Sequence, residues 1–429
     1  MKYKKYPSYK DSGIDWLGEI PSEWFNTKLK YHSFIYNGNS ISDNEKENYE
    51  NLDINNSIPY VSTKDIDSNF LTINYDNGMR VPICNNKFKI AKKSSTLICI
   101  EGGSAGKKLA LLNEKVCFVN KLACIDSYNG LDKRFSNYIV RSSIFNYLFN
   151  LATTGLIPGV SINQLKDFEI ILPSIKEQQQ IVNFLDKATA KIDTLIEKQT
   201  KQIELLKEKR QAVISHAVTK GINPNVPMKD SGVEWLGVIP EHWMISTLKF
   251  ELENLNFRRI PISALERGDI QGKYPYYGAS GVIDYVESYI FNEKTILIGE
   301  DGANLLSKST PLAFIVDGKY WVNNHAHILK PKDKIFNFWA YILNNIDLKP
   351  VITGSAQPKL TAEALGNLSI VLPKSTDERK LIANYLDNKT SKIDTLIEKS
   401  NKSIELLKEK RTALISAAVT GKIDVREFE

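Results

Sequence analysis

Residues 188–222 read ATAKIDTLIEKQTKQIELLKEKRQAVISHAVTKGI, and residues 389–423 read KTSKIDTLIEKSNKSIELLKEKRTALISAAVTGKI. The two blocks match at 25 of 35 positions, which indicates a tandem duplication. Neither Gly nor Pro occurs from residue 187 to residue 219, and good helix formers dominate. Each block therefore predicts a long helix, which stops at Gly221 in the first copy and at Gly421 in the second.

Apolar residues recur along both predicted helices at heptad spacing, which is typical of a coiled coil. A whole domain separates the copies, so the two helices can run antiparallel. Polar residues interrupt the heptads and either fix the register or lie exposed at the boundary. Leu195, Leu205, Leu396 and Leu406 widen the apolar stripe, which favours docking of a further helix. The apolar positions are Ile192, Ile196, Ile203, Leu206, Ile393, Ile397, Ile404 and Leu407, and the polar ones are Gln199, Arg210, Ser400 and Arg411.

A second repeat precedes each variable segment: KDSGIDWLGEIPSEW at residues 10–24 and KDSGVEWLGVIPEHW at residues 229–243. The segments between the repeats show little identity, which favours two different targets on one common frame. We therefore predict an α+β fold with a pseudo-twofold tandem repeat, in which two recognition domains with small mixed sheets are separated by an antiparallel coiled coil. The predicted parts are residues 1–173, the helix in 174–223, residues 224–373 and the helix in 374–429.

Within the variable segments, β-branched and aromatic runs predict strands, and longer apolar-periodic runs predict helices. The loops between them are rich in Gly and polar residues: 101–108, 153–161, 274–281, 299–304 and 353–359. The strands are expected at 58–61, 96–100, 116–119, 281–289, 294–298, 313–316 and 327–329, and the helices at 136–151 and 336–348.

Several kinds of chemistry have no signature in the chain. Its net charge is only +6, with 56 basic and 50 acidic residues, which permits local nucleic-acid contacts without requiring them. The four cysteines form no CxxC pair, and the His325-x-His327 pair has no further ligands at metal spacing, so we expect no metal. Strand alternation would place both of those histidine rings on one face.

Phosphate-loop, GxGxxG and amino-methyltransferase motifs are missing, so we expect no catalytic residues. No apolar run suits a membrane span or a signal peptide, so we expect a cytoplasmic protein.

The duplicated leading segments and helices, ILPSIKEQQQIVNFLD with its copy, and YPYYGASGVIDY followed by ILIGEDGAN and VNNHAHIL together resemble the specificity subunit of type I restriction-modification enzymes. The resemblance covers nearly the whole chain. It implies that each variable domain reads one half of a split double-stranded DNA site. It also implies two methyltransferase subunits and restriction-translocase subunits as partners. S-adenosylmethionine, ATP and Mg²⁺ are then expected in those partners and no cofactor in this chain.

Loop chemistry and the resemblance together suggest DNA contacts. Cationic side chains are candidates for phosphates, although Arg258 and Arg259 could equally be a solvated charged surface. Polar and aromatic loop residues are candidates for base contacts or their support, although tyrosines could equally be core residues. A coiled-coil scaffold that binds only proteins, and a self-contained enzyme, remain the alternatives. The phosphate candidates are Lys107, Lys108, Lys359, Arg258 and Arg259, and the base candidates are Ser104, Tyr276, Tyr277, Ser280, Asn304 and Gln357.

Overall fold

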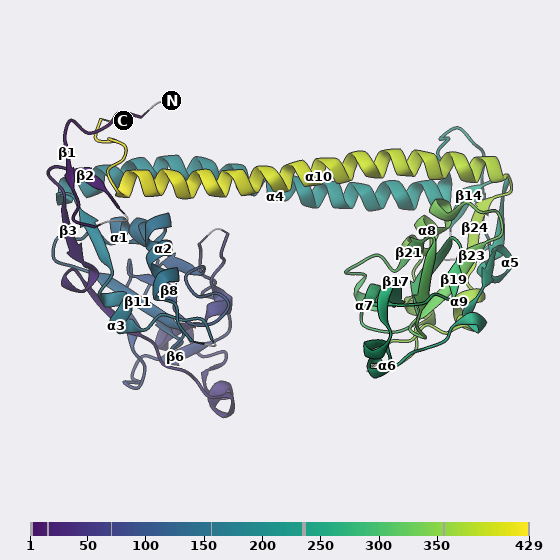
Figure 1. Ribbon diagram of the computed structural model, residues 1–429, viewed down its shortest axis with the longest axis horizontal. Helices are drawn as coiled ribbons and strands as arrows, with labels where there is room; N and C mark the ends of the chain where they lie inside the picture. The colour runs from purple at the N-terminus through teal and green to yellow at the C-terminus, as the bar shows by residue number, and fades with distance from the viewer. Residues whose placement is uncertain are drawn as a thin grey trace. The chain divides into compact units, whose positions relative to one another are not determined.

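The computed structural model describes residues 3–14, 17–69, 71–155, 157–233, 237–354 and 357–427. The chain divides into two compact units. The first unit holds Met1–Thr200 with Asn401–Glu429, and the second holds Lys201–Ser400. Each unit therefore contains one variable segment and a part of each long helix (Figure 1).

The first unit contains two four-stranded sheets with short helices beside them. One sheet has the order β6-β5-β10-β7 and the other the order β4-β11-β8-β9. The first unit also contains two two-stranded sheets, β1-β2 and β12-β3. The bounds are β1 Tyr9–Asp11, β2 Glu19–Pro21, β3 Phe25–Lys28, β4 Ser33–Asn37, β5 Ser57–Val61, β6 Arg80–Pro82, β7 Ile90–Ala91, β8 Thr96–Cys99, β9 Leu109–Leu111, β10 Val116–Phe118, β11 Leu122–Ser127, α1 Lys133–Val140, α2 Ser143–Ala152, α3 Ile162–Lys166 and β12 Glu169–Leu172.

The second unit repeats this arrangement strand for strand. Its sheets have the orders β18-β17-β22-β19 and β16-β23-β20-β21, with ladders β13-β14 and β15-β24. The parallel pair β5/β10 of the first unit corresponds to the parallel pair β17/β22. The bounds are β13 Met228–Asp230, β14 Val238–Pro240, β15 Trp243–Thr247, α5 Leu248–Glu251, β16 Leu252–Asn254, α6 Ala264–Asp269, β17 Gln271–Gly278, β18 Gly281–Val286, β19 Phe291–Asn292, β20 Thr295–Gly299, α7 Asn304–Ser307, β21 Ala313–Val316, β22 Lys319–Val322, β23 Ala326–Pro331, α8 Phe336–Asn345, α9 Ala362–Gly366 and β24 Ser369–Pro373.

The two long helices are α4 Ile175–Lys220 and α10 Thr376–Val419. Within each unit their segments lie side by side and antiparallel, since Asp193 contacts Arg411 in the first unit and Arg210 contacts Asp394 in the second. The predicted packing of the two long helices against each other is confirmed. Ile192, Ile196, Ile203, Ile393 and Ser400 are buried, whereas Gln199, Leu206, Ile397, Ile404 and Leu407 are partly buried.

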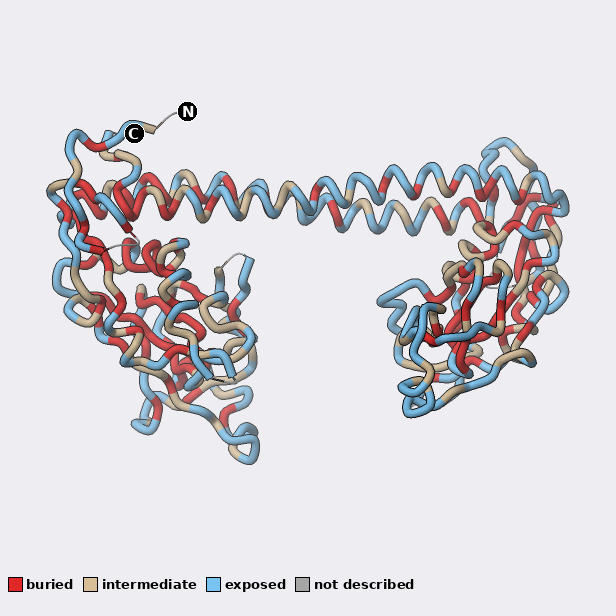
Figure 2. The backbone as a smooth tube through the Cα atoms, viewed as in Figure 1, coloured by how far each residue is buried: buried red, intermediate tan, exposed pale blue. Residues whose placement is uncertain are grey.

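Each unit has one large core that its variable domain and both helices share (Figure 2). In the first unit the fully buried Trp24 belongs to the same cluster as Leu185 of α4 and Ala418 of α10. In the second unit Trp243 belongs to the cluster that contains Ala217 of α4 and Leu386 of α10. The repeated tryptophan therefore joins each domain to the helices.

Two expectations about secondary structure were wrong. The helix predicted at 136–151 divides into α1 and α2, because the Ser142 hydroxyl accepts a hydrogen bond from the Phe145 N–H and starts a new helix. The segment predicted as a loop at 274–281 lies mostly in β17, paired on both sides, and only Ala279 and Ser280 form its turn. The first long helix begins at Ile175, inside the predicted range 174–223, because KEQQQIVNFLD buries Ile181 and Leu185 in the shared core.

Candidate nucleic-acid interface

In the first unit, two predicted loops that are far apart in sequence lie side by side. The Gly102 N–H donates a hydrogen bond to the Pro158 carbonyl at 2.8 Å, and the Val160 N–H donates to the Ile100 carbonyl at 2.9 Å. An isolated β-bridge also joins Glu101 to Gly159. The segments 101–108 and 153–161 therefore form one composite surface at the end of β8, which we call the loop pair.

The second unit builds the same loop pair from segments 299–304 and 353–359. The Gly302 N–H donates to the Pro358 carbonyl at 3.0 Å, and the Leu360 N–H donates to the Glu300 carbonyl at 2.8 Å. The β-bridge here joins Asp301 to Lys359. The backbone frame is thus the same in both units, although the loop sequences differ.

The side chains at matching positions of the two loop pairs have different chemistry. In the first unit Ile98 of β8 lies opposite Ala123, and the following Ile100 is buried. In the second unit Ile298 lies opposite His327, and Glu300 takes the place of Ile100. At this position the first unit has an apolar side chain, Ile100, and the second unit has a charged one, Glu300.

Glu300 is the centre of a charged cluster in the second unit. Its Oε2 lies 2.8 Å from Arg259 Nη1, and its Oε1 lies 3.7 Å from Lys359 Nζ. His327 Nδ1 is 3.6 Å from Glu300 Oε2 and accepts from Asn256 Nδ2 at 2.7 Å, while its Nε2 donates to the Leu360 carbonyl at 2.8 Å. Burial lowers the pKa of His327. The ring is therefore held neutral, with its proton on Nε2.

The two histidines do not share a face, contrary to our expectation. His327 is buried, whereas His325 is exposed and its Nδ1 lies 2.7 Å from Asp301 Oδ2. The difference arises because β23 begins at Ala326, so His325 precedes the strand and does not follow its alternation.

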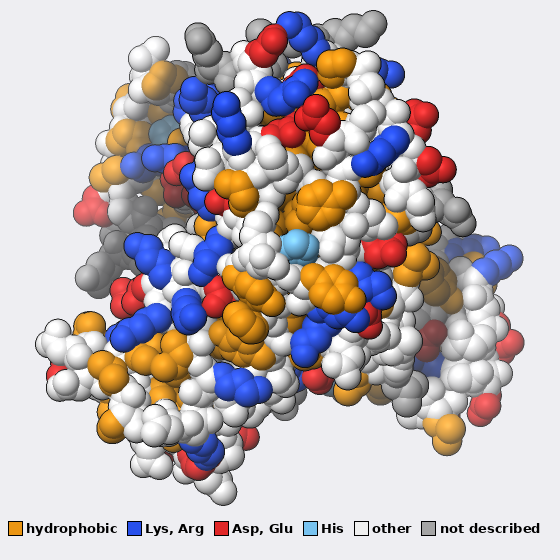
Figure 3. Space-filling view, turned by 90° about the vertical axis from the view of Figure 1, so that its left-hand side faces the viewer, with side chains coloured by type: hydrophobic (Ala, Val, Ile, Leu, Met, Phe, Trp, Pro, Cys, Tyr) orange, Lys and Arg blue, Asp and Glu red, His pale blue; other side chains and the backbone are white. Residues whose placement is uncertain are grey.

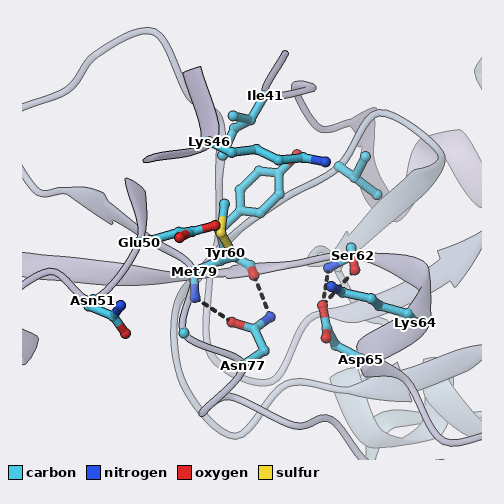
Figure 4. A pocket seen from close by; sticks show the side chains of 12 residues that line it. Ile41, Lys46, Glu50, Asn51, Tyr60, Ser62, Lys64, Asp65, Asn77 and Met79 are labelled. Atoms are coloured by element: carbon cyan, nitrogen blue, oxygen red, sulfur yellow. Dashed lines mark hydrogen bonds between the residues drawn. The ribbon is translucent and has the colours of Figure 1, made fainter. Parts of the chain in front are cut away.

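The connection between β5 and β6, residues 62–79, has no equivalent of its size in the second unit, where Ala279 and Ser280 alone join β17 to β18. We call it the insert. It borders two clefts, of about 640 Å³ and about 540 Å³, and Lys64 and Asp65 line both. In Figure 4 the Asn77 amide spans the wall of the larger cleft, donating to the Tyr60 carbonyl at 2.9 Å and accepting from the Met79 N–H at 2.9 Å.

The model of the type I restriction modification DNA specificity domain matches residues 21–205 and again residues 240–406. The chain belongs to this family. Over its whole length this specificity subunit is 23% identical to the type I restriction enzyme MjaIX specificity subunit of Methanocaldococcus jannaschii, covering 99% of that relative. It is 35% identical over 135 residues to the specificity subunit S.HindORF215P of Haemophilus influenzae, a match that spans 34% of that relative.

The fold is that of a solved chain described under the words "complex assembly and conformational transition of the type I R-M system". The superposition has a TM-score of 0.69 at 15% identity and covers 94% of this specificity subunit and 99% of that chain.

The predicted phosphate-contacting side chains of the specificity subunit are held in different ways. Lys107 is exposed, while Lys108 Nζ donates to the Thr63 carbonyl at 2.7 Å and so ties the loop pair to the insert. Arg258 pairs with Glu293 at 2.6 Å and lies 4.4 Å from the Phe291 ring centroid. Arg259 and Lys359 both pair with Glu300, but the Lys359 side chain is 55% exposed and remains accessible to a ligand.

The predicted base-contacting residues divide into a buried and an accessible group. Tyr276 is fully buried and its hydroxyl accepts from the Ile262 N–H at 3.1 Å, so it supports the fold. Tyr277 is partly buried, and burial raises the pKa of its hydroxyl. The Asn304 side-chain Oδ1 accepts from the Thr310 N–H at 3.0 Å and fixes its own loop. The others are Ser104, which is partly buried in a turn, and the exposed Ser280 and Gln357.

Sequence reasoning missed Lys64, which is exposed and makes no ion pair with any described residue. The extra length of the first variable segment is the signal that could have pointed to the insert. On the face shown in Figure 3, lysine and arginine side chains are interspersed with acidic and apolar ones.

The residues that the structure describes contain neither a membrane-spanning helix nor a cluster of metal ligands. Neither α4 nor α10, nor any shorter described helix, combines the length and hydropathy that a membrane span needs. Among the same residues, no three His, Cys, Asp or Glu side chains gather as a metal site would require.

Proposed function

We propose that this specificity subunit binds a bipartite, asymmetric double-stranded DNA site and reads one half of it with each variable domain. The observation that carries the proposal is the loop pair. The two units hold it with the same backbone hydrogen bonds but present unlike side chains, such as the exposed Ile157 and Gln357, which precede the matching Pro158 and Pro358. A common frame with different exposed side chains suits the reading of two different base sequences.

The proposal includes docking of two methyltransferase subunits and of restriction-translocase subunits. Four leucines along the coiled coil are between 45% and 56% exposed, and among the described residues no other helix covers them. Exposed apolar residues at repeated positions favour partner helices. They are Leu195, Leu205, Leu396 and Leu406.

We further propose that the chain has no catalytic role and acts in the cytoplasm. Methylation of an adenine requires the base to leave the stack, and we assign the base pocket and S-adenosylmethionine to the methyltransferase partners. ATP and Mg²⁺ are assigned to the restriction-translocase partners. The described cations of the loop pairs then hold the duplex while the partner acts.

The test is the salt dependence of DNA binding by the complex assembled with its methyltransferase. Phosphate contacts release counterions, so affinity should fall on the order of a thousandfold between about 50 and 200 mM salt. Lys107→Ala and Lys359→Ala should each lower the slope by about one unit, because each removes about one phosphate contact. Loss of salt dependence altogether, with the complex still assembled, would favour the protein-only scaffold.

A further inference from the structure

The insert forms a short hairpin in the first unit. Its base and its tip pack against two different hydrophobic cores. At its base an isolated β-bridge joins Ile66 to Ile73; Ile66 belongs to the core cluster of the two sheets, and the partly buried Ile73 packs against it. Near its tip Leu71, with φ of 56°, packs against the other cluster, which contains Ile415 and Ala418 of α10. The insert therefore joins two cores.

Polar contacts tie the tip of the insert directly to α10. Lys408 Nζ donates to Asn69 Oδ1 at 2.6 Å, and Arg411 Nη2 donates to the Asn69 carbonyl at 3.1 Å. Arg411 is itself buried and forms an ion pair with Asp193 of α4. Arg141, on the domain side, is partly buried near this pair. Asn69 thus contacts a rigid, well-packed part of the coiled coil.

These contacts form a second attachment between the domain and α10. The first is the shared core at Ile415–Val419, and Lys408 precedes Ile415 by about 10 Å along the helix axis at 1.5 Å per residue. A single attachment would let the variable domain pivot on α10. Two attachments at different points along the helix oppose that pivoting.

The second unit offers a natural comparison. The repeat counterpart of Lys408 is Lys207, which makes no ion pair or hydrogen bond with a described residue. The counterpart of Arg411 is Arg210, whose side chain contacts Asp394 alone among the described residues. The turn Ala279–Ser280 replaces the insert. The second unit therefore has no equivalent strut.

We propose that residues 67–69 and 71–72 act as a strut that fixes the angle of the first variable domain against α10, and that Asn69, Lys408 and Arg411 are positioning residues for the spacing of the two half-sites. This inference rests on the proposed function. With the strut intact, the complex accepts one spacer length; without it, the first domain tilts and neighbouring lengths become acceptable. The strut contacts no base in this proposal, so the half-site sequences stay the same.

The experiment uses the full chain assembled with its methyltransferase and DNA substrates whose half-sites are constant and whose spacer is correct, one base pair shorter or one longer. The variants are Asn69→Ala with Lys408→Ala, and a chain that lacks residues 68–71. Lys207→Ala is the matched control. Methylation of the off-length substrates relative to the correct one should rise by about fivefold in the strut variants, as loss of a hydrogen-bonded contact predicts, and stay constant in the control.

Several results would overturn the proposal. They are an unchanged spacing ratio in both strut variants, an equal loss of methylation on all substrates, or a change in the half-site sequence itself. Absence of sequence-specific methylation by the unaltered complex would instead remove the proposed function and this inference with it. The double substitution changes only two side chains at the surface of the contact, so it keeps the test decisive if the shortened chain does not fold.

Discussion

Arg210 of α4 forms an ion pair with Asp394 of α10, with Nε 2.9 Å from Oδ1. The duplication places the same two residue types at Arg411 and Asp193, and these also pair, in the other unit. From the sequence, Arg210 and Arg411 could either fix the register of the helices or lie exposed at the boundary of the apolar stripe. Each arginine pairs with an aspartate of the opposite helix, because the helices are antiparallel and bring the KEKR segment of one copy beside the KIDTL segment of the other.

Arg411→Ala should destabilise the protein more than Arg210→Ala. Arg411 is buried, and its removal leaves Asp193 without its partner, so we expect a loss on the order of 2 kcal/mol in the free energy of unfolding. This is below the cost of a fully buried pair because the Asp193 side chain is 32% exposed. The more exposed Arg210 pair should lose about 0.5 kcal/mol. Urea unfolding measures both, and equal losses would contradict the assignment.

Gly421→Ala should be more harmful than Gly221→Ala, although each glycine closely follows the end of a long helix. Both have positive φ, 71° and 78°, which costs an alanine about 1–2 kcal/mol. A Cβ on Gly421 would also lie 2.3 Å from Pro21 Cγ, whereas on Gly221 its nearest neighbour is Trp243 at 3.3 Å. Thermal unfolding of the two variants compares them. A larger loss for Gly221→Ala would show that the close approach to Pro21 can relax.

Cys84 should react with iodoacetamide well before the other three thiols in the native protein. It is exposed, whereas Cys99, Cys117 and Cys124 are buried. Burial raises the pKa of Cys117 and Cys124 to about 11, which further reduces their thiolate fraction. Mass spectrometry of peptides after labelling at pH 8 measures each rate. Cys117 or Cys124 reacting as fast as Cys84 would contradict their burial.

Acidification should weaken the second unit through His327. Burial lowers its pKa in the folded state, so below about pH 6.5 the unfolded chain binds a proton that the folded chain does not. Stability from the neutral ring is therefore complete above pH 6.5 and is lost as the pH falls toward the folded pKa. The stability difference between the native chain and His327→Gln should shrink between pH 7.5 and pH 5.5. The exposed His325→Gln is the control, and a constant difference for His327→Gln would contradict the effect.

The parts of the fold that repeat in the sequence could be predicted from it. The similarity of the two blocks predicted two equal helices. A helix without a partner would have left Ile192 and Ile393 exposed, so the sequence also predicted that the two helices pair. The hairpin at β17 could not be predicted, because its tyrosines suit a recognition loop and a strand equally well. What separates the two is pairing with β22, a contact between segments distant in sequence.

The candidate site was predictable only as a set of loops. Gly-rich segments indicated turns, but nothing local showed that Gly102 would meet Pro158, or that Arg259 would be engaged by Glu300. The insert was visible only as extra length. Its contact with Lys408 depends on the packing of a loop on a helix more than three hundred residues away in the chain.

The most direct test of the account is the methylated motif made by the complex after residues 25–173 are exchanged for the corresponding segment of another specificity subunit. Sequencing that detects N6-methyladenine in the DNA of the host would report both half-sites at once. We predict that one half of the motif changes while the other half, read by the second unit, keeps its sequence. A change in both halves, or in neither, would contradict the assignment of one reader to each unit.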